Sequence, residues 1–314
     1  MIAHSLEEAA VFRPCALTIG NFDGVHLAHR RLLRAAIDCG GRAGLKPAVL
    51  MFDPHPSCVV APERAPRLLT SLEERCALIQ EEGIENILIQ PFTAELARLT
   101  PEEFAMRFLR DGLDVRCVIV GENFRFGCKQ AGNTEMLKQL GSRLGFEVRL
   151  LETVRWRGRR VSSGEVRKVV ASGEVAIAGR LLERPYAISG DIVSGHGIGS
   201  KQTVPTLNLR TEAQVVPARG VYVTRTADLD GLSRWNSITN IGYRPTFGDD
   251  DALSIETFLL DPLEGAAPAR IRLEFLRRVR EERKFESPEA LKEQILHDVA
   301  RAKAFFRRLP PRNR

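Results

Sequence analysis

Two histidines lie three residues apart, at a point where an expected strand gives way to an expected helix. The chain of 314 residues holds six histidines, and His26 and His29 follow the apolar run Cys15–Gly20. A spacing of three places both imidazoles on one face of the first helical turn, where free backbone N–H groups and the helix dipole attract anions. Two imidazoles there can hydrogen-bond a triphosphate and stabilise the charge that develops when a phosphorus atom is attacked. Two ordinary histidines beside a turn are the alternative interpretation.

A glycine-rich stretch at 194–202 is a second candidate for phosphate binding. Gly197 and Gly199 allow successive backbone N–H groups to converge on phosphate oxygens, next to Ser200, and Lys201 adds a positive charge. The spacing does not fit a Walker A loop, and no helix is expected to follow it. A hairpin turn is the alternative interpretation of such a loop in a β-rich region.

The elements that would position the histidines alternate between strand and helix, which predicts a Rossmann-like α/β domain with a parallel sheet and helices on both faces. Ligands of such sheets bind beyond the carboxyl ends of the strands. Thr100 and Glu103 form an expected capping box around Pro101. Strands are expected at Cys15–Gly20, Pro47–Phe52, Asn86–Ile89, Arg116–Val120 and Phe146–Leu151, and helices at Leu27–Cys39, Leu72–Glu82, Pro101–Arg110 and Asn133–Leu140.

The composition of the chain changes near residue 185, after which glycine, proline and short β-like runs dominate. This pattern predicts a small antiparallel β-barrel or sandwich. The boundary is expected near Gly179–Arg184, which gives domains 1–183 and 184–314. Ser287–Phe306 is expected to form a terminal amphipathic helix, with Ser287 as its N-cap. The runs that predict strands are Tyr186–Val193, Gly220–Thr226, Ser237–Ile241, Ser254–Leu260 and Ile271–Phe275.

Composition places the chain among ordinary globular proteins, with 44% apolar and 27% charged residues. The net charge is +6, but the basic residues are spread along the chain, so we expect no nucleic-acid partner. The six cysteines form no CxxC pair, which predicts reduced and mostly buried thiols rather than a zinc site or a disulfide framework. No apolar run is long enough to span a membrane, and the first residues do not read as a secretory signal, so we expect a cytoplasmic protein.

Residues 20–29, GNFDGVHLAH, resemble the GNFDGVHxGH signature of the adenylyltransferase half of bacterial bifunctional riboflavin kinase/FAD synthetases. That half belongs to the HxGH nucleotidyltransferase superfamily. Ala28 stands where the family has glycine, and its methyl group would weaken ATP binding without abolishing it. The resemblance implies a catalytic role for His26 and His29, and ATP or phosphate binding by Gly20, Asn21 and Phe22.

Three further segments of the first half are similar to motifs of the same family, in the family's order. They are FDPHP at 52–56, GENFRFG at 121–127 and VSSGEVR at 161–167. Gly164 and Gln130 depart from the residues usual in the family. The resemblance implies that the flavin is bound by Asn123, Phe124 and Arg125, and that a phosphate is bound by Ser162, Ser163 and Arg167.

The second half resembles the riboflavin kinases of this family. The glycine-rich loop is followed by PTLN at 205–208, and NIGYRPTFG at 240–248 and IETFLLD at 255–261 match later motifs. The resemblance implies that Thr206 and Asn208 hold Mg²⁺ and nucleotide phosphates, for which a hydroxyl and an amide oxygen are suitable hard ligands. It also implies that Glu256 is the catalytic base.

The sequence therefore predicts an enzyme that phosphorylates riboflavin to FMN and adenylylates FMN to FAD, releasing pyrophosphate. The expected ligands are ATP, Mg²⁺, riboflavin, FMN and FAD, and the expected state is a monomer or a weak self-associate. The alternative is a riboflavin kinase whose adenylyltransferase half is weak or inactive, to which Ala28 and Gly164 point. A non-enzymatic nucleotide- or RNA-binding regulator is a third hypothesis, and no RNA-binding aromatic motif favours it.

Overall fold

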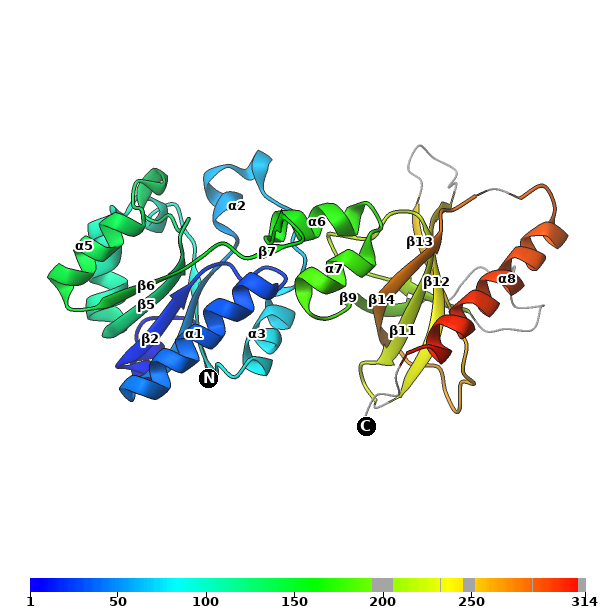
Figure 1. Cartoon of the computed structure of the whole chain (residues 1–314), viewed down its shortest axis with the longest axis horizontal. Helices are drawn as coiled ribbons and strands as arrows, with labels where there is room; N and C mark the ends of the chain where they lie inside the picture. The colour runs from blue at the N-terminus through cyan, green and yellow to red at the C-terminus, as the bar shows by residue number, and fades with distance from the viewer. Residues whose placement is uncertain (194–205, 232, 245–251, 284, 310–314) are drawn as a thin grey trace. The chain divides into compact units, whose positions relative to one another are not determined.

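The computed structural model describes residues 1–193, 206–231, 233–244, 252–283 and 285–309. The chain divides into two compact units, Met1–Ser163 and Gly164–Arg314. Figure 1 shows an α/β unit that contains the first strands and a β-barrel unit that contains the last ones. This confirms the predicted fold class. The predicted domain boundary at 183/184 stays a prediction.

The first unit is built on one six-stranded parallel sheet in the order β1-β4-β3-β2-β5-β6. After β2 the chain adds β3 and β4 on one side, and it then returns to place β5 on the other side of β2. The strand order therefore switches between β2 and β5, which is where open α/β sheets bind their ligands. The strands are β1 (Ile2–Ala3), β2 (Cys15–Ile19), β3 (Lys46–Asp53), β4 (Asn86–Pro91), β5 (Val115–Gly121) and β6 (Glu147–Leu151).

Helices cover both faces of this sheet, because successive strand residues are apolar on both sides. Leu17 and Val118 contribute to the core under α5 (Thr134–Leu144), together with buried residues of the segment 104–113. Ala16 and Ile119 contribute to the opposite core, under α1 (Leu27–Ala43) and α3 (Leu72–Glu81). The two cores hold the strands rigidly, so the loops at their carboxyl ends are presented on a fixed frame.

The remaining helical segments of this unit are short. The predicted capping box of Thr100 and Glu103 is present at the start of α4 (Pro101–Phe104), which widens into the π-helical segment Ala105–Gly112. A small antiparallel hairpin of β7 (Arg155–Trp156) and β8 (Arg159–Arg160) precedes α6. The others are α2 (Pro56–Val60) and the 3₁₀ turns Glu8–Phe12, Pro62–Arg64, Leu96–Arg98 and Cys128–Gln130.

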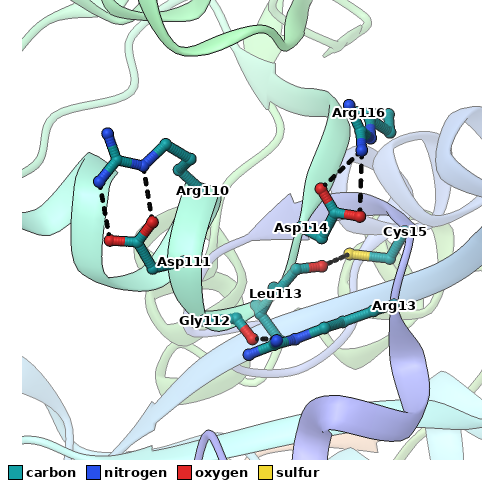
Figure 2. A network of polar contacts seen from close by, with 8 residues as sticks. All are labelled: Arg13, Cys15, Arg110, Asp111, Gly112, Leu113, Asp114 and Arg116. Atoms are coloured by element: carbon teal, nitrogen blue, oxygen red, sulfur yellow. Dashed lines mark hydrogen bonds and ion pairs between the residues drawn. The ribbon is translucent and has the colours of Figure 1, made fainter.

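Polar contacts fix the amino ends of β2 and β5, at the edge opposite the histidines. Figure 2 shows Arg13 Nε donating to the carbonyl oxygen of Gly112 at 2.6 Å, and the Cys15 thiol donating to that of Leu113 at 3.4 Å. The two strands are therefore held together at the start as well as along their ladder.

The second unit contains a closed antiparallel barrel in the order β10-β13-β12-β11-β14-β9. Val221, Val223 and Ile238 face outward and pack with Ala302 of α8 (Pro288–Arg307). Because side chains alternate along a strand, Thr224 and Thr239 point to the interior, where their hydroxyls are 2.7 Å apart. The strands are β9 (Tyr186–Val193), β10 (Thr206–Arg210), β11 (Gly220–Asp228), β12 (Arg234–Arg244), β13 (Ala252–Leu259) and β14 (Arg270–Arg280).

The helices of the second unit differ from expectation in two respects. Besides α6 (Ser163–Ala171), a further helix, α7 (Val175–Leu182), lies before the barrel and packs on β14 and β9. The expected N-cap of α8 is confirmed, because Ser287 accepts from the N–H of Ala290 at 3.2 Å. The helix was expected to be amphipathic, but its Leu291 and Ile295 are 41% and 48% exposed, because only the second half of the helix packs on the barrel.

Candidate functional site

The loop after β2 brings the two histidines together at the start of α1. His26 is 4% exposed and occupies the N-cap position of α1, where its side chain accepts from the N–H of His29. The two imidazole rings are stacked, with centroids 3.7 Å apart and planes 14° apart. The predicted shared face is therefore confirmed, and both rings lie at the first turn of α1.

The cap contact determines which tautomer a neutral His26 ring adopts. Its Nδ1 atom accepts the hydrogen bond from His29 N at 3.4 Å, so the proton of the neutral ring is on Nε2. An N–H donor on Nε2 is what a phosphate oxygen requires. The helix start thus provides a backbone dipole and a side-chain donor at one place.

A third histidine, in the loop after β3, contacts Asn21 of the loop after β2. The distance between Asn21 Nδ2 and His55 Nε2 is 2.9 Å, and His55 Nδ1 accepts from the N–H of Ser57 at 3.2 Å. This contact links the loops that follow two neighbouring strands of the sheet.

We call the loop between β2 and α1, residues 20–26, the histidine-bearing loop. Ser163 contacts this loop within the same unit. Its Oγ donates to the carbonyl oxygen of Asp23 at 2.9 Å, although the two residues are 140 positions apart in the chain. Helix α6 begins at Ser163, so Ser162 occupies the N-cap position. Ser163, one of the two serines predicted to bind a phosphate, therefore contacts the loop that carries the histidines. Arg167 belongs to the second compact unit, and its place beside the histidines stays a prediction.

The loop after β5 presents the predicted flavin-binding residues. Asn123 and Arg125 are exposed, while Phe124 is half-buried and stacked on Phe126 with ring centroids 5.6 Å apart. The amide of Asn123 donates to Thr153 Oγ1 at 3.2 Å. The same Thr153 hydroxyl donates to the neighbouring Glu122, and this hydrogen bond lowers the pKa of Glu122. The loop therefore offers an aromatic face with polar groups around it.

In the second unit the barrel register aligns three polar residues across neighbouring strands. Asn208 of β10 is paired directly with Glu256 of β13, and Glu256 is paired on its other side with Asn240 of β12. Directly opposed residues share one face of the sheet, with Cβ atoms about 5 Å apart. The three side chains form what we call the polar row, Asn208–Glu256–Asn240. All three residues are partly exposed.

Two more residues belong to this face. Thr206 lies two positions before Asn208 on β10 and is exposed, so both point to the same side, as predicted. Ser254 lies two positions before Glu256 and donates its hydroxyl proton to Glu256 Oε1 at 3.0 Å. The predicted loop residues Gly197, Gly199, Ser200 and Lys201 lie outside the described residues.

The sequence interpretation assigned no role to Asn240, His55 or Ser254. Asn240 and His55 lie in segments already recognised as motif-like, but only the strand register and the folded loops show which side chains they approach. The signal that was available for Asn240 was its position after a run of alternating residues on an expected strand. No signal in the sequence pointed to Ser254.

Two negative findings concern the described part of the chain. Within it, no helix combines the length and the apolar character needed to cross a membrane. Among those same residues, no group of three His, Cys, Asp or Glu side chains is placed to hold a metal ion. The six cysteines all lie in the described part and are free thiols, four of them buried, as the sequence predicted.

Comparison with known families identifies both halves of the chain separately. Residues 8–165 match the family model of FAD synthetase, and residues 182–306 match that of riboflavin kinase. These matches include the polar row in the second half and the histidines in the first.

Named relatives carry both halves in one chain. A bifunctional riboflavin kinase/FMN adenylyltransferase of Pseudomonas fluorescens is 38% identical over 93% of each chain. A protein of the same name from Escherichia coli K12 is 35% identical over 96% of each chain. A crystal structure from Streptococcus pneumoniae, described as a macrolide-efflux protein, has a TM-score of 0.86 and covers 96% of this chain and 98% of its own. Its sequence identity is 24%, so it bears on the fold alone.

Proposed function

Because the chain belongs to the family of bifunctional riboflavin kinase/FMN adenylyltransferases, we propose that it converts riboflavin to FMN and FMN to FAD, with ATP as the donor in both steps. The observation that supports the proposal is the presence of both family halves in one chain, and each half contains a cluster of polar groups. These groups are the stacked histidines at the start of α1 and the polar row of the barrel.

In the adenylyltransferase step, a phosphate oxygen of FMN attacks the α-phosphorus of ATP. The new P–O bond forms as the bond to the β-phosphate oxygen breaks, and pyrophosphate leaves. The nucleophile is already an anion, so no strong base is needed. His26 Nε2–H, the ring of His29 and the N–H groups at the start of α1 donate to the phosphate oxygens, whose charge increases in the transition state.

In the kinase step, the 5′-hydroxyl of riboflavin attacks the γ-phosphorus of a second ATP and ADP leaves. Glu256 accepts the hydroxyl proton, and the hydrogen bond from Ser254 holds its carboxylate in place. Asn208 and Asn240 lie on opposite sides of Glu256. We assign Asn208 to the nucleotide side, together with Thr206, and Asn240 to the riboflavin side, where its amide contacts the ribityl chain.

The family implies a Mg²⁺ ion for the kinase step, and the residues present fit one. Thr206 and Asn208 share a face of β10, and neither is buried, so a hydroxyl oxygen and an amide oxygen are accessible on one side of the strand. Such oxygens are the hard ligands that Mg²⁺ takes alongside water and phosphate. These two residues would hold the ion, which when bound neutralises charge on the transferring phosphate.

A riboflavin kinase with a weak adenylyltransferase half is the second candidate function. Ala28 favours it, because this residue lies in the first turn of α1, between His26 and His29 in the sequence, where the family has glycine. Incubation with FMN and ATP, without riboflavin, separates the two candidates. We expect FAD and pyrophosphate in equal amounts. Formation of FMN from riboflavin by a preparation that yields no pyrophosphate from FMN would establish the second candidate.

A further inference from the structure

We infer that Thr70, which lies outside every recognised motif, is a positioning residue of the adenylyltransferase site. The inference rests on the proposed function of the first unit. Thr70 links Asp23, in the histidine-bearing loop, to the start of α3. It is 47 positions away from Asp23 in the sequence.

Asp23 is buried, with 2% exposure, and one carboxylate oxygen collects three hydrogen bonds. Its Oδ1 accepts from the N–H of Leu69 at 2.9 Å, from the N–H of Thr70 at 3.2 Å and from the Thr70 hydroxyl at 3.3 Å. A buried carboxylate is costly unless such donors surround it. The segment 69–70 supplies these donors, so the loop and the segment stabilise each other.

The Thr70 hydroxyl also accepts a hydrogen bond. Its Oγ1 accepts from the N–H of Gly24 at 3.0 Å while it donates to Asp23. One side chain therefore bonds to two successive residues of the histidine-bearing loop. We call these contacts, of Thr70 with Asp23 and Gly24, the Thr70 clamp.

The loop needs such a clamp because its backbone is strained. Phe22 has φ 50°, Gly24 has φ 78° and Val25 has φ 37°. Only glycine adopts positive φ without strain, and a β-branched residue such as Val25 is an outlier there. A loop of this kind relaxes unless its surroundings hold it. The residue that follows Val25 is His26, the N-cap of α1.

Thr70 is itself held in place by the start of α3. Thr70 directly precedes the N-cap residue of α3, where Ser71 and Glu74 form a complete capping box. The carbonyl oxygen of Thr70 also faces Arg75 Nη2 at 3.5 Å, and Arg75 is 1% exposed. The start of α3 thus fixes Thr70, Thr70 fixes Asp23 and Gly24, and these fix the backbone that carries His26. Loss of the Thr70 hydroxyl would shift the histidines relative to the phosphates.

Thr70→Val tests this, because valine keeps the shape and removes the hydroxyl. We expect kcat/KM for FAD formation from FMN to fall about 10- to 100-fold, since small misplacements of catalytic groups have effects of this size. Riboflavin phosphorylation, carried by the other half of the same chain, stays unchanged and reports on the amount of chain whose second unit is folded. Thr70→Ser retains the hydroxyl and is expected to restore FAD formation. Thr93→Val, at an exposed turn, is the matched control and leaves both activities unchanged.

Hydrogen exchange measures the clamp without relying on activity. The Gly24 amide is expected to exchange faster in Thr70→Val than in the wild type, while the amides of β2 and β5 keep their protection. Unchanged exchange at Gly24, or wild-type FAD formation by Thr70→Val, overturns the inference. If Thr70→Val unfolds the first unit, Thr70→Ser decides, and a folded serine variant without FAD formation overturns the inference as well. A wild-type protein that makes no FAD would instead reject the proposed function, and the exchange comparison would still test the clamp.

Discussion

Asn208 and Glu256 are directly opposed on adjacent antiparallel strands, so the amide and the carboxylate share one face of the barrel. The register that pairs them also pairs Glu256 with Asn240, which puts an amide on each side of the carboxylate. A carboxylate between two amides can accept a proton while both neighbours bind substrate. This arrangement is the basis of the kinase assignment.

Glu256→Gln is expected to lower kcat for riboflavin phosphorylation by about 10²- to 10⁴-fold, because the amide cannot accept the hydroxyl proton. Gln has nearly the same shape, so binding of ATP is expected to change little. FAD formation from added FMN stays at the wild-type rate, since it occurs in the other half. Steady-state rates of both half-reactions measure this. Glu264→Gln, on the exposed loop between β13 and β14, is the control with no effect. A Glu256→Gln enzyme with wild-type kcat would exclude Glu256 as the base.

His26 has two roles that substitutions can separate, because it caps α1 and donates to phosphate. Asn is a good N-cap residue, so His26→Asn keeps the helix start, whereas His26→Ala loses about 1 kcal/mol of stability in addition. Both variants are expected to lose about 10²- to 10³-fold in kcat for FAD formation. His4→Asn, at an exposed position, is the control. If His26→Asn formed FAD as fast as the wild type, the cap would be the only role of His26.

Alkaline pH is expected to destabilise the first unit through its buried thiols. Burial raises the pKa of Cys15 from 9.0 to about 12, with a contribution from the nearby Asp114 carboxylate. In the unfolded chain this thiol ionises near pH 9, and in the folded chain it does not. The contribution of Cys15 to stability is therefore constant below pH 9 and falls as the pH rises from 9 toward 12, by up to about 1.4 kcal/mol per pH unit.

Denaturant unfolding of the wild type at pH 7.5, 9 and 10 measures this dependence. Cys15→Ala is expected to reduce the slope above pH 9, and Cys58→Ala, which removes an exposed thiol, to leave it unchanged. Equal slopes for the wild type and Cys15→Ala would show that the buried thiol does not cause the dependence.

The ion pair between Arg280 and Asp298 is expected to hold α8 on the barrel. Arg280 Nε lies 2.8 Å from Asp298 Oδ2, and the side chains are 18% and 4% exposed. Gln294 Nε2 donates to the other carboxylate oxygen at 2.8 Å. Asp298→Ala leaves a nearly buried guanidinium without its partner, so the free energy of unfolding of the second unit should fall by roughly 3–5 kcal/mol. Asp230→Ala, at an exposed turn, is the control. A loss no larger than that of the control would show that water replaces Asp298 at no cost.

The sequence located most of the strands because they are buried apolar runs, although β12 and β14 extend beyond their predicted ends and β10 was not among the predicted runs. The predicted strand Tyr186–Val193 matches β9 at both ends. The ends of helices were more difficult to predict than those of strands. Helix α1 continues to Ala43, although the sequence favoured an end at Cys39, before two glycines. The structural reason is packing, since a Cβ atom at Gly40 would lie 2.7 Å from the carbonyl oxygen of Leu45. Glycine is needed there by a close contact, not by a turn.

The sequence likewise identified some residues of the candidate site and missed others. His26 and His29 were singled out by residue type and spacing, and Asn208 by the resemblance of its motif to that of riboflavin kinases. Residues that act by supporting them were missed, because their partners are distant in the chain. Thr70 bonds to Asp23 across 47 positions, and Asn240 meets Glu256 only through the barrel register. Local spacing carries no information about such pairs.

Separation of the flavins formed over time from riboflavin and excess ATP-Mg tests the bifunctional assignment most directly. We predict that FMN appears first and that FAD follows after a lag, as FMN becomes available to the first unit. Absence of FMN throughout the time course, or FMN that accumulates to completion with no FAD, would contradict it.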